Sequence, residues 1–404
     1  MKKLILSLAL IGATTLAFGQ KKVVRSAEKN FKSGDLQTAL SEVEAATNDP
    51  ETGSDPETYL LKAKIETKMF GSDSSNTMQT YEVGQAALAT YMKTFEMGGS
   101  DKTSGIGEEV WEDDVTGVPD NLRPYSINTL KNTSFDKAID RYNEGDQEMA
   151  YYFFDLAGEI DPADTTIHYN AGFLANDLEM YEEAKKHFNL LLDVEEYDKL
   201  NTYYFMVQIL SGAESNPEAA YDMVMAARED YPEDKILAEY EIQLLLQLNK
   251  MDEAMASINE ALKNDPNNAS ILLRSGFLKE KSGDLDGAMA DYKRSVEVDP
   301  DFYDGNFYTG ALMLDRAREI LAELNGLSDD EWEKRSEAMG KEADNYYKES
   351  IPYFTKVLEI RPENTDVMEI LFQVHTRLKN EAEADKYNKK LIELVGPNWM
   401  DGGN

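Results

Sequence analysis

The stretch Ala269–Phe302, ASILLRSGFLKEKSGDLDGAMADYKRSVEVDPDF, determines the fold expected for this chain. Its apolar and small residues recur at helical spacing on both sides of a glycine-containing turn. Small residues at Gly276 and Ala288 allow two helices to approach closely, Tyr292 fills the gap to a neighbouring element, and Pro300 ends the second helix. The stretch is therefore predicted to be a helical hairpin that needs neighbouring hairpins to cover its apolar faces.

Most of the chain is a variation on this hairpin. Pro232, Pro266 and Pro300 each end a second helix and are separated by one repeat length, about 34 residues. Other second helices repeat the order of a small residue, a bulky residue and a further small or apolar residue. These sets are Ala150/Phe154/Ala157, Ala184/Phe188/Leu191, Ala220/Val224/Ala227 and Ala254/Ile258/Ala261. Packing at the helical period between neighbouring hairpins explains this recurrence.

This pattern resembles the tetratricopeptide repeat (TPR), in which W-x2-L-G-x2-Y is followed by A-x3-F and then P. In Ala269–Phe302 the matching residues are Leu272, Gly276, Ala288, Tyr292 and Pro300. Lys279 stands where the pattern has Tyr, and Ser275 where it has Leu, so the first helix is the degenerate half. The resemblance implies an all-α fold, an α-α superhelix of about nine helical hairpins.

The array is predicted to contain one insertion and one lengthened hairpin. Degenerate hairpins over 20–97 precede a stretch rich in Gly, Asp and Pro, 98–124, which is interpreted as a loop insertion that is either functional or disordered. The core array follows over 125–302. Residues 303–362 are predicted to form an elongated hairpin, and 363–404 a capping hairpin with a tail.

Residues 1–19 have the features of a secretory signal peptide: two lysines, a short apolar run, and small residues before a predicted cleavage site at Gln20. The apolar run is too short and too interrupted for a membrane anchor, and no later segment is apolar enough to insert. The chain has no cysteine, so its stability is expected to come from packing. The mature protein is predicted to be soluble and either periplasmic or secreted.

The formal net charge is -36 at pH 7. Such a charge repels nucleic acid and anionic membrane surfaces, so neither is an expected partner. Two explanations of the acidity are open, solubility in a crowded exported space and recruitment of a basic partner.

Motifs for catalysis or metal binding are not evident. His168 and His187 lie in the two helices of one predicted hairpin, where they could meet, but they and His375 are too dispersed to indicate a metal cluster. The acidic run 112–114 beside Trp111 is the better metal candidate, yet a chain with 77 acidic residues contains such clusters by composition alone. The sequence therefore predicts no enzyme, no cofactor and no metal.

TPR arrays bind extended peptides or protein segments along the concave wall formed by their first helices, so the resemblance implies a groove there. Two positions one helical turn apart are mostly aromatic or aliphatic along these helices. The first is occupied by Phe135, Tyr169, Phe205, Glu239, Leu273 and Phe307, and the second by Ile139, Phe173, Ile209, Gln243, Phe277 and Ala311. About half of these side chains are expected to turn into the core. Partner contact is predicted first at Tyr169, Phe173, Phe205 and Phe277, and then at Phe135 and Phe307.

The resemblance also indicates which ligands to expect. TPR domains that bind chaperones present Lys, Asn and Arg to a terminal carboxylate, whereas aromatic residues hold these positions here, so acidic chain termini are not expected. The predicted function is an exported TPR scaffold that binds a segment of another cell-envelope protein along the apolar and aromatic groove. The alternative is a receptor for a small solute or glycan, which would use Trp111 in the 98–124 insertion. The sequence leaves the oligomeric state open.

Overall fold

The computed structural model describes residues 21–103, 105–115, 117–119 and 122–401. The predicted signal peptide, 1–19, and the cleavage site at Gln20 lie outside these residues. The described residues form helices joined by turns and contain no β-strand, which confirms the all-α prediction. Within the same part of the chain, no helix combines the length and the apolar character that a membrane span requires.

The chain divides into two compact units, the first ending at Ser215 and the second beginning at Asn216. The sequence predicts one uninterrupted array over 125–302, so this boundary is a feature that sequence analysis did not find. It follows a five-residue π-helix, η2 (Ile209–Ala213), which interrupts regular α-helical hydrogen bonding at the end of α10 (Leu200–Gln208). Ser215 itself has a positive φ of 50°.

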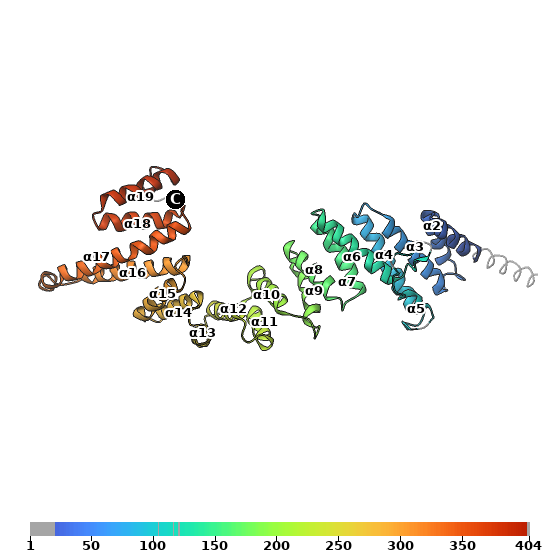
Figure 1. Cartoon of the computed structure of the whole chain (residues 1–404), viewed down its shortest axis with the longest axis horizontal. Coiled ribbons are helices and arrows are strands. Elements are labelled where there is room, and N and C mark those ends of the chain that lie inside the picture. Colours follow the sequence, from blue (N-terminus) through green and yellow to red (C-terminus); the bar gives the residue numbers. More distant parts are fainter. Residues whose placement is uncertain (1–20, 104, 116, 120–121, 402–404) are drawn as a thin grey trace, which may run out of the picture. The chain divides into compact units, whose positions relative to one another are not determined.

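Helical hairpins build the first unit (Figure 1). Residues 21–33 form its first described helix, which pairs with α2. The later helices are α2 (Leu36–Thr47), α3 (Pro56–Ser72), α4 (Met78–Met97), α5 (Gly105–Val110), α6 (Ile127–Asn143), α7 (Gln147–Ile160), α8 (Thr165–Asp177), α9 (Tyr181–Leu192) and α10 (Leu200–Gln208). Many of these helices start at an acidic or hydroxyl N-cap, such as Asp146 and Asp164, whose side chains accept hydrogen bonds from free backbone N–H groups. Part of the acidity of the chain is therefore structural.

The insertion 98–124 is not a loop throughout, because it contains the six-residue helix α5. A buried carboxylate ties its later part to α6. Asp114, whose side chain is fully buried, binds Arg123 through two hydrogen bonds of 3.0 and 2.8 Å. Asp114 also accepts from Thr129 Oγ1 at 2.9 Å and Asn132 Nδ2 at 3.3 Å. The hydrogen bonds from Arg123, Thr129 and Asn132 outweigh burial and hold the pKa of Asp114 below its usual range.

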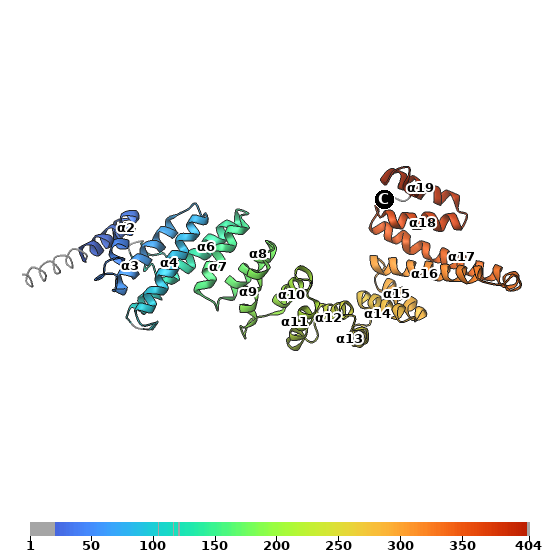
Figure 2. The same ribbon diagram turned by 180° about the vertical axis from the view of Figure 1, so that it is seen from behind.

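The second unit has the same hairpin architecture with one lengthened pair. Its helices are α11 (Pro217–Asp230), α12 (Lys235–Gln247), α13 (Met251–Asn264), α14 (Ala269–Lys281), α15 (Leu285–Val298), α16 (Tyr303–Asn325), α17 (Asp329–Ile360), α18 (Thr365–Arg377), α19 (Glu381–Leu394) and the 3-10 helix η3 (Trp399–Asp401). The α16–α17 hairpin reaches beyond the ends of α15 and α18, as the sequence predicts (Figure 2). Helix α17 continues through Pro352.

The hairpins are held together by glycines that face aromatic rings. A β-carbon added at Gly276 would lie 2.5 Å from the ring of Tyr292, closer than real β-carbons approach other atoms. Equivalent close pairs recur in both units. They are Gly84 with Phe70, Gly172 with Phe188, and Gly310 with Phe354. The aromatic members of these pairs are fully buried, so the small-residue and bulky-residue positions of the sequence pattern form the core of each unit.

The turns inside the hairpins repeat a left-handed backbone conformation at about the repeat length. Positive φ angles occur at Gly145, Glu179, Ser215, Asn249 and Gly283. Glycine adopts this conformation without a steric cost and asparagine tolerates it, but Glu179 and Ser215 do so against their preference. The packing of the flanking helices therefore imposes this turn even where the sequence has no glycine.

Candidate functional site

The predicted groove residues of the first unit lie partly against its core. Phe135 and Phe205 are half-buried, and each contacts a buried phenylalanine of a second helix. The Phe135 ring meets Phe154 edge-on with a centroid distance of 5.5 Å, and Phe205 stacks on Phe188 at 5.2 Å. Phe173 contacts Phe205 edge-on at 6.1 Å and is also half-buried. Phe173, Phe205 and Phe188 thus form one aromatic surface with its inner side in the core, and Phe135 contacts the core separately through Phe154.

Tyr169 on α8 is half-buried, whereas Ile209, which occupies the second predicted groove position, is only 2% exposed. The row of partly exposed groove residues in the first unit is thus interrupted at the π-helix. In the second unit Phe307 packs against Phe354 with a centroid distance of 6.1 Å, on the side of a core cluster. Phe277 and Leu273 instead face a cavity.

This cavity has a volume of about 330 Å³ and is bounded by three successive first helices, α12, α14 and α16, with one residue from α15. Its walls are mostly aromatic or aliphatic. They consist of Leu246, Ser270, Leu273, Arg274, Phe277, Tyr292, Phe302, Asp304 and Tyr308. Tyr308 is 38% exposed, and the Tyr292 and Tyr308 rings lie 5.9 Å apart. The cavity is the candidate site because first helices supply most of its surface.

Arg274 is the charged residue of α14 in this cavity, and the sequence analysis did not single it out. Its guanidinium donates to Ser270 of its own helix, to the carbonyl oxygen at 3.3 Å and to the hydroxyl group. Burial lowers its pKa, although Glu239 and Asp304 act in the opposite direction. The sequence does indicate that Arg274 has no ion-pair partner within its own helix, because no acidic residue lies three or four positions from it.

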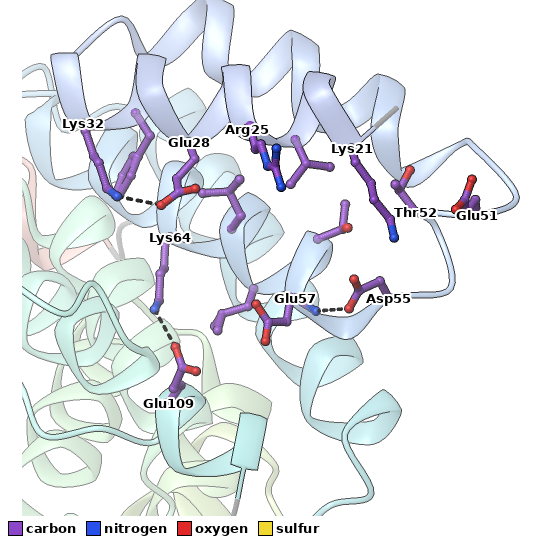
Figure 3. Close-up of a pocket in the computed structure, with 15 residues that line it drawn as sticks. Lys21, Arg25, Glu28, Lys32, Glu51, Thr52, Asp55, Glu57, Lys64 and Glu109 are labelled. Atoms are coloured by element: carbon purple, nitrogen blue, oxygen red, sulfur yellow. Dashed lines mark hydrogen bonds and ion pairs between the residues drawn. The ribbon is translucent and has the colours of Figure 1, made fainter. Parts of the chain in front are cut away.

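A second cavity, of about 670 Å³, lies between helix 21–33, α3 and α5 (Figure 3). Charged groups of both signs line it, and several are already paired. Lys32 Nζ lies 2.6 Å from Glu28 Oε1, and Lys64 Nζ lies 3.2 Å from Glu109 Oε2. A wall of mixed charge favours no single ligand charge, so this cavity is a weaker candidate.

Trp111 borders a third cavity, of about 570 Å³, together with residues of α6, α7 and α9. Its Nε1 atom is buried and has no hydrogen-bond partner in the described part of the chain. The ammonium group of Lys102 lies 3.3 Å from the centroid of the indole ring, and Phe95 meets the ring edge-on at 6.0 Å. A sugar ring could not stack on the face that Lys102 covers. The run 112–114 forms no metal site, because among the described residues no three His, Asp or Glu side chains are placed to hold one ion.

His168 and His187 meet in the core of the first unit, with their Nδ1 atoms 2.9 Å apart. Both are at most 2% exposed. His187 Nε2 lies 3.3 Å from Asp155 Oδ1, which also accepts a 2.8 Å hydrogen bond from Lys186 Nζ. Burial, followed by the neighbouring His187, lowers the pKa of His168. The pair is a structural contact that is stable while His168 is neutral.

Acidification is therefore expected to weaken the first unit. His168 has an ordinary pKa of 6.5 when the chain is unfolded and a lower pKa when it is folded. Below about pH 6.5 the unfolded state binds a proton that the folded state does not, so the free energy of unfolding falls by up to about 1.4 kcal/mol per pH unit. Hydrogen exchange of residues 151–192 at about pH 7.5 and 5.5, corrected for the intrinsic exchange rate, measures this. In His168→Gln the pH dependence should shrink; an undiminished dependence would show that another group is responsible.

Comparison with known proteins identifies repeats around the candidate site. A profile described as tetratricopeptide repeat matches residues 243–268 and 269–302. No curated protein matches the chain significantly. Among solved structures, the C-terminal part of a TPR repeat-containing protein from Cytophaga hutchinsonii is 13% identical, with a TM-score of 0.46 over 66% of this chain and 97% of that one. YrrB, described as a TPR protein with an unusual peptide-binding site, is 20% identical, with a TM-score of 0.36 over 53% of this chain and 95% of that one.

Proposed function

Because the chain is a tetratricopeptide-repeat protein, we propose that it is an exported scaffold that holds a segment of another cell-envelope protein against the first helices of its hairpins. A TPR fold indicates a scaffold for protein–protein interaction, and TPR proteins are generally not enzymes. The cavity bounded by α12, α14 and α16 is the observation that carries the proposal. Export rests on the signal-peptide features of residues 1–19.

The size of the cavity suits an extended protein segment. Packed helices lie roughly 8–10 Å apart, so a path across three first helices is roughly 20 Å long. An extended chain covers about 3.3 Å per residue, which makes this path about six residues of partner. The side chains along it, such as Leu246, Phe277 and Tyr308, present apolar surface that a partner would remove from water.

The charge of the scaffold restricts the partner as a whole. A net charge of -36 repels strongly acidic proteins at long range and attracts basic ones. The partner is therefore a protein that is neutral or basic overall, and its bound segment is mainly apolar. Salt is expected to slow the association of a basic partner.

Site-specific photo-crosslinking in the cells that produce the protein tests this function. A photoreactive amino acid at Phe277 is expected to capture one envelope protein through a short segment that mass spectrometry can map. The same probe at Lys263, which is exposed on the second helix α13, serves as the control. Equal adducts at the two positions, or none at Phe277 in a folded and exported variant, would refute the scaffold proposal.

A probe at Phe173 examines the aromatic surface of the first unit in the same way. Adducts at both Phe173 and Phe277 with one partner would extend the binding surface beyond the candidate cavity. Adducts at Phe277 alone would restrict binding to the second unit.

The second candidate function is a receptor for a small solute at Trp111. The unpartnered Nε1 atom and the adjacent cavity favour it, whereas Lys102 on the ring face opposes stacking. Trp111 emission in a variant with Trp332→Phe and Trp399→Phe reports on this site. Saturable changes on titration with simple sugars would support the receptor.

A further inference from the structure

The guanidinium of Arg274 lines the cavity, and its residue is only partly buried and makes no ion pair within the described part of the chain. Among the described residues, no carboxylate oxygen lies within 4.0 Å of it, and its hydrogen bonds go to Ser270 alone. Arg228, on α11 of the same unit, shows the usual arrangement, with Glu241 Oε2 at 2.7 Å. Removing a charge from water is unfavourable unless an opposite charge or several hydrogen bonds replace the water.

Aromatic walls surround this cation. Phe277, Phe302 and Tyr308 line the same cavity, which has room for two or three side chains of a ligand. A guanidinium has five N–H donors in a planar fork that matches the two oxygens of a carboxylate, and only part of this fork is used by Ser270. The complementary ligand therefore carries a carboxylate beside apolar groups.

Resting on the scaffold function proposed above, we propose that this cavity binds one internal acidic side chain, Glu or Asp, of an otherwise apolar partner segment, with its carboxylate on Arg274. The apolar neighbours of that acidic residue lie against Phe277 and Tyr308. Arg274 thus fixes the register of the bound segment. A shift of the segment by one residue would place its carboxylate in apolar surroundings.

An internal side chain fits the charges better than an acidic chain terminus. Asp304 is exposed at the start of α16 and lines the cavity, and Glu239 is close enough to influence Arg274. With these two carboxylates the site already has a net charge of about -1, so a further carboxylate is held only by direct hydrogen bonds to the guanidinium. A terminus with a second carboxylate nearby would be repelled by Asp304 and Glu239.

The first test uses the full chain and a small probe, 3-phenylpropanoate, with the uncharged 3-phenylpropanamide as its match. NMR titration is expected to show that the carboxylate binds about tenfold or more tightly than the amide. Arg274→Gln should remove this preference. Asp304→Asn should strengthen carboxylate binding several-fold, because a repulsive charge is removed. Equal affinity for acid and amide, or a preference that survives in Arg274→Gln, would overturn the proposal.

Two controls separate binding from folding. Arg294→Gln changes an exposed arginine of α15 that pairs with Glu297 and Asn267, and it should leave carboxylate binding unchanged. Urea denaturation of Arg274→Gln is expected to give a midpoint equal to or higher than that of the parent chain, because a partly buried charge without an ion pair is lost. A clearly lower midpoint would mean that Arg274 has a structural role, which contradicts the proposal.

Hexapeptides of Leu and Phe then show whether the bound carboxylate is an internal side chain or a chain terminus. Both ends are capped in the peptides with a central Glu or Gln, and only the N-terminus is capped in the third peptide. Calorimetry should rank a peptide with one central Glu above its Gln counterpart and above a peptide whose only carboxylate is its free C-terminus. Tighter binding of the C-terminal carboxylate would overturn the choice of an internal residue.

Peptide binding also separates this inference from the scaffold function. Peptide binding that requires Phe277 but not Arg274 would overturn this inference without contradicting the scaffold function. Binding of 3-phenylpropanoate through Arg274 without binding of any peptide would instead count against the scaffold.

Discussion

Replacing Tyr292 with alanine is expected to lower the free energy of unfolding of the second unit by about 3–5 kcal/mol. The side chain is fully buried and fills the space above Gly276, so its removal leaves a cavity between α14, α15 and α16. Its hydroxyl group also donates a 2.8 Å hydrogen bond to Glu280 Oε2. Each hairpin is stabilised mainly by its neighbours, so the loss should spread to the adjacent pair of helices.

Urea denaturation followed by circular dichroism measures this loss, and Tyr292→Phe separates its two causes. Phenylalanine keeps the ring and removes the hydroxyl, so it should cost only about 1 kcal/mol. If Tyr292→Ala cost no more than Tyr292→Phe, the ring would not be the element that joins these hairpins. The same alanine variant should also widen the candidate cavity, because Tyr292 forms part of its wall.

Replacing Asp114 with alanine is expected to release the insertion. The substitution leaves Arg123 without its carboxylate and removes acceptors from Thr129 and Asn132. Because Arg123 is 31% exposed and stays partly solvated, the cost is that of the lost hydrogen bonds, about 1–3 kcal/mol, and it falls on the attachment of 98–124 to α6. Hydrogen exchange should become faster in the insertion and remain unchanged in α8 and α9.

Asp113→Ala is the matched control for this prediction. Asp113 is the adjacent acidic residue and is exposed, so its loss should leave exchange in the insertion within error of the parent chain. Similar exchange in the two variants would show that the network around Asp114 does not hold the insertion. A released insertion should also change Trp111 emission, because Asn128 of α6 donates to the Trp111 carbonyl oxygen at 2.9 Å.

The hairpin architecture could be predicted from the sequence because its causes are local and periodic. Gly276, Ala288 and Tyr292 occupy fixed offsets on two short helices, and helical geometry alone brings such residues to one face. The long hairpin over 303–362 could be predicted for the same reason, since α16 and α17 are strongly periodic. The all-α fold is thus a property of the sequence pattern.

The candidate site could be predicted only in part. Phe277 was predicted to contact a partner and lines the cavity, but the Phe135, Phe205 and Phe307 rings contact buried phenylalanines. The helical period places all four residues on one face of their helices, but it does not determine whether each ring is oriented toward the second helix or toward solvent. That orientation depends on packing against the neighbouring hairpin.

By itself, the sequence determined where the helices of the hairpins lie, which of them pair, and which small and bulky residues meet between them. Only the tertiary structure showed the unit boundary after η2, the contact of His168 with His187, and the unpaired state of Arg274. The helices, their pairing and these contacts depend on residue spacing within one repeat, which can be read directly from the sequence. The features that only the tertiary structure showed depend on which groups of different helices come within a few ångströms, and this is decided when the hairpins pack together.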